Sequence, residues 1–157
     1  MMEGRDIRKI GSPASIVELF SVISRLYYSK QILLSKDVGR LLTKLPEEKK
    51  ILAIVTSIIL DWGIEFPRVG LELKRLSLAG IDAFLPEFMA EACKLSARLR
   101  LRTMDNIHMV FAKLVSEIEG LDYVITSDEE LLRKRALVKS VSGLELLSPM
   151  EFISLKA

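Results

Sequence analysis

The chain has 157 residues, half of them apolar, which suits one folded domain with a substantial core. Its net charge of +2 at pH 7 is too small to indicate a nucleic-acid partner by itself. The single cysteine, Cys93, excludes an internal disulfide and a thiolate metal cluster; we expect it in the core, and we expect a reducing, cytoplasmic location. No N-terminal stretch has the form of a secretory signal, and the longest apolar run, Ile51 to Leu60, is too short to cross a bilayer.

The first half of the chain reads mainly as helices, because its apolar residues recur at helical spacing. The Ser12-Pro13 pair marks the start of the first helix, Ser35 is a candidate cap for the second, and Gly63 ends the third. The charged start of the chain includes Asp6, which opens a candidate edge strand. The predicted helices and the brief strand after them cover residues 13–29, 36–45, 47–62 and 64–66. The leucines of residues 68–80 fit either a strand or a short amphipathic helix.

The second half alternates helices with strands, so the sequence predicts an α/β fold. A helix begins after Pro86, Thr103 caps the next helix, and Gly120 ends it. The predicted elements in chain order are helices over 87–101 and 103–119, a strand over 121–125, a helix over 129–136, a strand over 137–141 and a helix over 150–155. The strand over 137–141 is predicted from its composition and its alternation.

One carboxylate stands out because of where it falls between two predicted elements. Asp128 follows the apolar strand at 121–125, after Thr126 and Ser127, and either Ser127 or Asp128 can cap the next helix. The carboxyl ends of strands are where ligand sites form in open α/β sheets. Asp128 is therefore the first candidate site residue.

Two further acids can reach the same edge of the predicted sheet. Asp105 lies in the first turn of its helix, 23 positions before Asp128 (128 − 105), and one helix with the strand it feeds accounts for that distance. Glu18 lies near the start of the first helix, outside its apolar stripe. Clustered carboxylates repel one another unless a cation bridges them, and Mg²⁺ or Mn²⁺ binds through carboxylates, water and phosphates. Taken singly, each acid is more often only a helix cap.

Other polar residues near these acids allow two interpretations. His108, three residues after Asp105, is more typical of packing or hydrogen bonding than of a site whose ligands are mainly oxygen. Two basic sets are typical of solvated faces, and alternatively they line a groove for a phosphate backbone. These sets are Arg98, Arg100 and Arg102, and then Arg133, Lys134, Arg135 and Lys139.

Four segments, in this order, resemble the PIN-domain family, which includes the VapC toxins of prokaryotic toxin–antitoxin pairs. They are Pro13 to Leu19 with its Glu, Met104 to Ala112 with Asp105, the hydrophobic strand into Thr126-Ser127-Asp128, and Leu144 to Phe152 with its strand and Pro-started helix. Each motif is weak alone, and the ordered set is moderately specific.

The resemblance implies a PIN-like three-layer fold, with a central, mainly parallel sheet flanked by helices. It implies a single domain over 1–157, with extra helices inserted over about 36–80. It also implies an endoribonuclease that hydrolyses RNA phosphodiesters with Mg²⁺ or Mn²⁺, in which Glu18, Asp105 and Asp128 are metal-site carboxylates supported by Thr126 or Ser127. The implied partners are RNA, an antitoxin protein and a second copy in a homodimer, with no membrane. The wide apolar helix around Ile51 to Leu60 is a candidate dimer interface.

The chain departs from the family at its start. PIN domains begin with a strand that ends in an acid, and no hydrophobic strand into an Asp precedes Glu18 here; Asp6 does not match that pattern. A missing acid weakens metal binding and impairs catalysis. The alternative function is therefore a non-catalytic PIN-like module that binds RNA or a protein.

Overall fold

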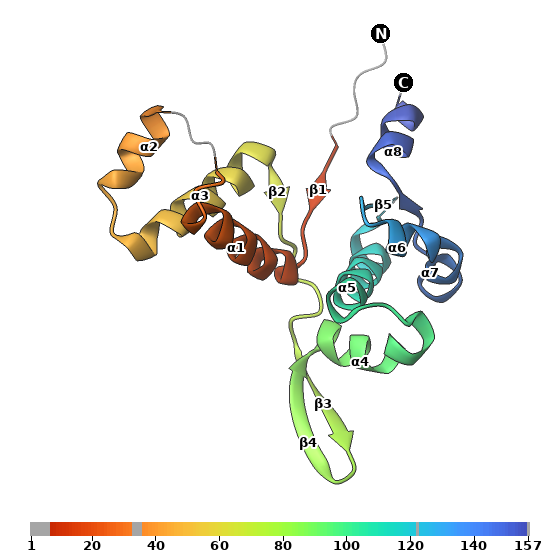
Figure 1. Ribbon diagram of the computed structural model, residues 1–157. Coiled ribbons are helices and arrows are strands. Elements are labelled where there is room, and N and C mark those ends of the chain that lie inside the picture. The colour runs from red at the N-terminus through yellow and green to blue at the C-terminus, as the bar shows by residue number, and fades with distance from the viewer. Residues whose placement is uncertain (1–6, 33–35, 122, 157) are drawn as a thin grey trace. The chain divides into compact units, whose positions relative to one another are not determined.

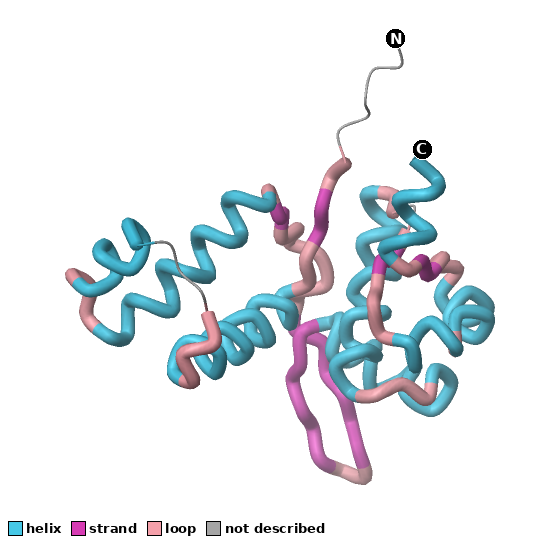
Figure 2. The backbone as a smooth tube through the Cα atoms, turned by 45° about the horizontal axis from the view of Figure 1, so that its top comes forward, coloured by secondary structure: helices cyan, strands magenta, loops and turns pink. Residues whose placement is uncertain are grey.

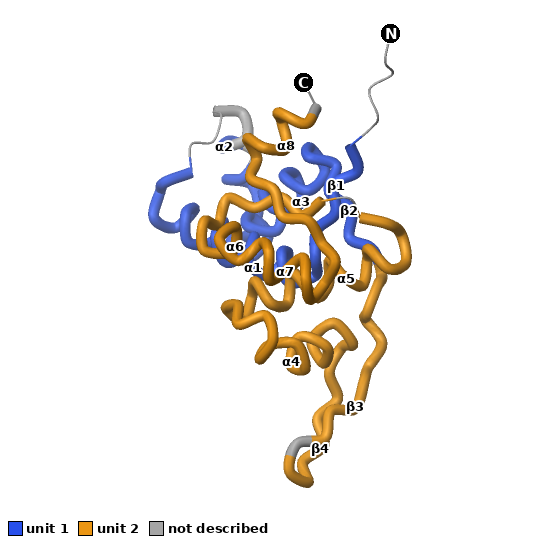
Figure 3. Tube along the Cα trace, turned by 90° about the vertical axis from the view of Figure 1, so that its right-hand side faces the viewer, with its two compact units in different colours: residues 1–67 blue, residues 68–157 orange. Residues whose placement is uncertain are grey.

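A computed structural model describes residues 7–32, 36–121 and 123–156 (Figure 1). The protein is a mixed α/β chain in which helices predominate and the strands are short (Figure 2). It has two compact units, residues 1–67 and residues 68–157, and each is described by itself (Figure 3). In the described parts of the chain, no helix is long and apolar enough to span a membrane. Asp6 and Ser35, to which the sequence assigned a strand and a cap, lie outside the described residues, as does Asp122.

The first unit consists of three helices and one pair of strands. Its elements are β1 (Lys9–Ile10), α1 (Pro13–Tyr28), α2 (Lys36–Thr43), α3 (Glu47–Trp62) and β2 (Ile64–Glu65). Helix α1 begins where predicted, because Ser12 Oγ accepts a hydrogen bond from the Ser15 N–H at 3.1 Å. Helix α3 ends where predicted, because Gly63 adopts the left-handed conformation, with φ of 59°.

The core of the first unit lies among its three helices. Its buried members are apolar residues at helical spacing: Ile23, Leu42, Ile51, Ile54 and Val55. Strands β1 and β2 pair in parallel, with Lys9 opposite Ile64 and Ile10 opposite Glu65. The helices of this unit thus bury one apolar face each, as their spacing predicted.

The second unit begins with a hairpin and continues with alternating helices and short strands. Its elements are β3 (Leu73–Leu78), β4 (Ile81–Pro86), α4 (Glu87–Leu99), α5 (Thr103–Glu119), β5 (Val124–Ile125), α6 (Glu129–Arg133), α7 (Arg135–Ser142), β6 (Leu146–Leu147) and α8 (Pro149–Lys156). Its core is formed by Ala92, Leu99, Met109, Val110, Leu131, Val138, Leu144 and Leu146.

The strands of the described residues form three sheets of two strands each. The pairs β1–β2 and β5–β6 are parallel, and β3–β4 is an antiparallel hairpin. The α/β class is therefore confirmed. The larger central sheet of a PIN-like fold, and the single domain, stay predictions.

The predicted strand over residues 137–141 is wrong, because these residues belong to helix α7. Val138 is fully buried, Leu137 and Val141 are half-buried, and Lys139 is exposed. Burial at 137, 138 and 141 follows the helical period, whereas a strand would have placed 137, 139 and 141 on one face. Gly143, with φ of 76°, then ends the helix.

Several smaller expectations are settled or corrected. The uncertain stretch 68–80 contains strand β3, and residues 81–86 pair with it as β4. The predicted helical insertion is therefore helical only through Trp62. Thr103 is the first residue of α5 and not its cap; Arg102 holds the cap position without a side-chain hydrogen bond. Cys93 is exposed and does not lie in the core.

Candidate functional site

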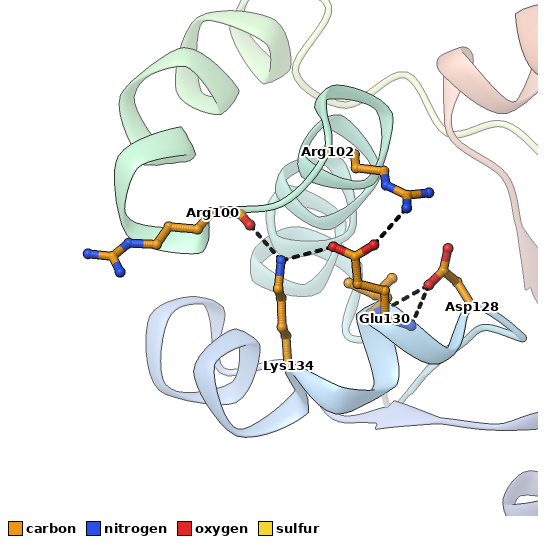
Figure 4. Close-up of polar contacts among 6 residues, drawn as sticks. Arg100, Arg102, Asp128, Glu130 and Lys134 are labelled. Carbon is orange, nitrogen blue, oxygen red and sulfur yellow. Dashed lines mark hydrogen bonds and ion pairs between the residues drawn. The ribbon is translucent and has the colours of Figure 1, made fainter.

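Asp128 holds the start of helix α6, directly after strand β5. Its Oδ1 accepts hydrogen bonds from the backbone N–H groups of Glu130 at 2.7 Å and Leu131 at 3.0 Å (Figure 4). The Asp128 N–H donates in turn to Thr126 Oγ1 at 3.1 Å. The predicted cap is thus Asp128, and Thr126 fixes the loop that carries it, whereas Ser127 is exposed beside them.

The Asp128 carboxylate is ionised and keeps one oxygen available. The hydrogen bond from the Leu131 N–H contributes most to lowering the pKa of Asp128. The Glu130 N–H and the positive charges of Arg102 and Arg133 lower this pKa further, while partial burial opposes them. Both backbone bonds go to Oδ1, so Oδ2 has no hydrogen-bond partner among the described residues (Figure 4).

A polar network joins the start of α5 to the start of α6. Glu130 forms an ion pair with Arg102 at 2.7 Å through one carboxylate oxygen and with Lys134 at 3.3 Å through the other. Lys134 also donates to the backbone carbonyl of Arg100 at 2.7 Å (Figure 4). Two contacts therefore connect the turn between α4 and α5 to α6. Arg102 pairs with Glu130, and Lys134 binds the Arg100 carbonyl.

Asp105 lies near this network along the chain. It occupies the first turn of α5, three residues after Arg102, and its side chain is half-buried. The 2.7 Å contact between Arg102 and Glu130 brings the starts of α5 and α6 together. The role of Asp105 as a metal-site carboxylate stays a prediction.

Asn106 is a polar residue that the sequence argument missed. It is buried between α4 and α5, and its Nδ2 donates to the Ala92 carbonyl at 2.7 Å. Its Oδ1 has no partner among the described residues. Neighbouring His108 is half-buried. The sequence around Asn106 contains no pattern that predicts its hydrogen bond to the Ala92 carbonyl.

Glu18 belongs to the first unit. It lies on α1 beyond the first turn, where the sequence had placed it only approximately, and it is half-buried. Its membership of a metal site stays a prediction.

The donor chemistry of Asp128 fits a hard divalent cation. A carboxylate oxygen without a hydrogen-bond donor is the type of ligand that Mg²⁺ and Mn²⁺ prefer, and Mg²⁺ sites often use only one or two carboxylates plus water and phosphate. Across the described residues, no three His, Cys, Asp or Glu side chains gather as a metal-binding group. A cation at Asp128 would need water or substrate oxygens among its ligands.

The fold and the site define this chain as an α/β protein with an ionised carboxylate at the end of a strand. No protein-family model, curated protein or solved structure matches it. The PIN-domain resemblance accordingly remains a hypothesis from the sequence.

Proposed function

We propose that the protein is a PIN-like endoribonuclease that requires Mg²⁺ or Mn²⁺, with Asp128 as a metal ligand. The observation that supports this most is the state of the Asp128 carboxylate, which is ionised, held through Oδ1 and open at Oδ2. Asp105, on the helix whose start lies against α6, is the second proposed ligand.

The residues of the chain have separable roles in this proposal. Thr126 and the first turn of α6 orient the Asp128 carboxylate, so that Oδ2 does not need to reorganise when it binds a cation. The bound cation supplies charge neutralisation at the phosphodiester and a water molecule of lowered pKa. Antitoxin binding and homodimer formation remain predictions from the family resemblance.

A second candidate function is favoured by the charges around Asp128. Arg102 lies close enough to lower the Asp128 pKa, and Glu130 is already engaged by Arg102 and Lys134. The carboxylates of this region are thus balanced by basic side chains without a cation. This balance supports the non-catalytic module that binds RNA or protein.

Asp128→Asn separates the two functions, because asparagine also caps helices well and the substitution removes mainly the charge. We expect Mn²⁺-dependent cleavage of single-stranded RNA by the wild type and none by Asp128→Asn. The thermal midpoint should fall only slightly, because asparagine keeps the cap and loses the favourable charge at the helix start. Glu129→Gln is the matched control, since it removes a charge from the exposed neighbouring residue. Its cleavage rate should equal that of the wild type.

Asp105→Asn and Glu18→Gln extend the same cleavage assay to the other predicted ligands. Full activity in both Asp128→Asn and Asp105→Asn would remove the proposed mechanism. Calorimetry supplies the independent measurement: a wild type that binds no Mn²⁺ at millimolar concentration and cuts no RNA is the non-catalytic module.

A further inference from the structure

Most basic side chains of the second unit are paired with a carboxylate. Arg135 contacts Glu151 at 2.9 Å, and Lys139 lies 3.7 Å from Glu145. The sequence had grouped these two residues with Arg133 and Lys134 in one basic set. The structure divides that set, because Arg135 and Lys139 already have acidic partners.

Three arginines of this region keep guanidinium N–H donors that no carboxylate occupies. Arg100 and Arg133 are exposed, and neither has an ion pair within the described residues. Arg102 has a 70% exposed side chain and touches Glu130 through one terminal nitrogen, which leaves most of its five N–H donors unused. We call Arg100, Arg102 and Arg133 the arginine cluster.

Contacts place Arg102 and Arg133 near Asp128 and the backbone of Arg100 at the edge of the same polar network. Arg102 is held by Glu130, two residues after Asp128, and Arg133 lies on the same short helix. The charges of Arg102 and Arg133 both act on the Asp128 carboxylate. The Arg100 carbonyl is fixed by Lys134, while its side chain extends away from the network (Figure 4).

The backbone at Arg100 is itself constrained. Arg100 ends α4 in the left-handed conformation, with φ of 50°, where glycine or asparagine is the usual residue. Its N–H donates to the Ser96 carbonyl at 2.9 Å and its carbonyl accepts from Lys134 at 2.7 Å. An arginine at this position presents an exposed guanidinium from a fixed backbone.

The acids of this region are largely engaged. Asp128 accepts hydrogen bonds from two backbone N–H groups, and Glu130 pairs with Arg102 and Lys134. Among the described residues of this region, Glu129 is exposed and makes no such contact. The donors that remain belong to guanidinium groups, whose planar fork matches phosphate oxygens.

We propose that Arg100, Arg102 and Arg133 bind the phosphodiester backbone of single-stranded RNA next to Asp128. This inference rests on the proposed function for its placement at a site of RNA cleavage. Since phosphate contacts position a nucleic acid without reading its sequence, the cluster would hold a strand across Asp128 with little base preference.

The test measures binding of the full chain to a short fluorescein-labelled single-stranded RNA in EDTA, by fluorescence anisotropy over a series of salt concentrations. Each phosphate contact that is lost should reduce the slope of log K against log salt by about 0.7. Arg100→Gln/Arg133→Gln leaves the polar network intact and should reduce the slope by about 1.4. Arg102→Gln should reduce it by about 0.7.

Arg68→Gln is the matched control. Arg68 is also exposed, and it precedes Gly70, whose carbonyl accepts from Phe88 at the first turn of α4. The arginine cluster begins at the opposite end of that helix, about 20 Å away at 1.5 Å per residue. Arg68→Gln should bind RNA as the wild type does.

Three outcomes would overturn the inference: no RNA binding by the wild type, equal slopes for Arg100→Gln/Arg133→Gln and Arg68→Gln, or binding to anionic phospholipid vesicles without binding to RNA. A cleavage assay with Mn²⁺ separates this inference from the proposed function. Loss of binding in the arginine variants with no cleavage by the wild type supports the cluster and removes the nuclease. Cleavage by the wild type with unchanged KM in the variants removes the cluster and keeps the nuclease.

Discussion

Glu151 holds the start of α8 by reciprocal contacts with Ser148. Its Oε2 accepts from the Ser148 N–H at 2.7 Å, and Ser148 Oγ accepts from the Glu151 N–H at 3.2 Å, which is a capping box. Arg135 adds a contact at 2.9 Å to the other carboxylate oxygen. The Ser148 N–H, followed by Arg135, lowers the pKa of Glu151 from 4.5 to about 2.

This lowered pKa predicts an acid-sensitive contribution to stability. A carboxyl group whose pKa is depressed by folding stabilises the folded state above its unfolded pKa, and this contribution is lost as the pH falls. We expect the free energy of unfolding to drop between about pH 4.5 and about pH 2, and Glu151→Gln to flatten that drop. Urea unfolding at several pH values measures it, with Glu129→Gln as the control. Equal pH dependence in the wild type and Glu151→Gln would contradict the assignment.

Part of the candidate site could be predicted from single residues. The sequence predicted Asp128 as a candidate helix cap, because Asp is a preferred residue at the position between an apolar strand and the helix that follows it. The ion pair between Glu130 and Lys134 could also be predicted from the sequence, since side chains four residues apart on a helix lie close together. The contact between Arg102 and Glu130 could not be predicted, because it depends on how α5 and α6 pack. That packing is a tertiary property that no local spacing encodes.

At the scale of elements, the β3–β4 hairpin has an unusual turn. Ala79 and Gly80 both have positive φ, 49° and 85°, as the two central residues of the tightest hairpin turns require. Ala79 lacks the freedom of glycine at that position. Leu73, Ile81 and Phe84 are exposed on the hairpin, which pairs with no third strand in the described residues. A two-stranded hairpin of this kind is only marginally stable without packing.

Ala79→Gly should therefore stabilise the hairpin, by up to about 1 kcal/mol, because it relieves the left-handed conformation of an alanine. Hydrogen exchange of the β3 and β4 amides would show slower exchange in this variant. Ala83→Gly, within β4, is the matched control and should have the opposite sign. Faster exchange in Ala79→Gly would show that the turn is not strained.

The helices that the sequence located best are those with strong end signals. Ser12-Pro13 and Gly63 fixed α1 and α3 almost to the residue. Helix α7 was missed because Val138 and Val141 favour strands by composition, and burial against α4 and α5 overrides that preference. The strands proved short, so the apolar run at 121–125 yields only Val124 and Ile125 as β5.

At the scale of the whole molecule, two separate cores stabilise the chain. One cluster draws its buried residues from 23–55 and the other from 92–146, so each belongs to one compact unit. Leu99 is fully buried in the second cluster and Ile54 is buried in the first. A substitution of Leu99 or Ile54 by alanine therefore weakens the packing of one core only.

Leu99→Ala should destabilise the second unit by about 2–5 kcal/mol, because it removes buried apolar contacts and leaves a cavity. Hydrogen exchange should show lost protection in α4 and α5, with α1 and α3 unchanged. Ile54→Ala is the reciprocal variant and should give the reverse pattern. Loss of protection in both units from either substitution would show that the chain unfolds as a single cooperative body.

The exposed thiol of Cys93 has a practical consequence. It is the only cysteine of the chain and it lies on α4, two turns before Arg100. A disulfide between two copies of the chain can therefore form only through this residue, and a non-reducing gel would reveal such a covalent pair. The same thiol accepts a maleimide fluorophore at one defined place, so the unmodified sequence already carries its own attachment point for spectroscopy.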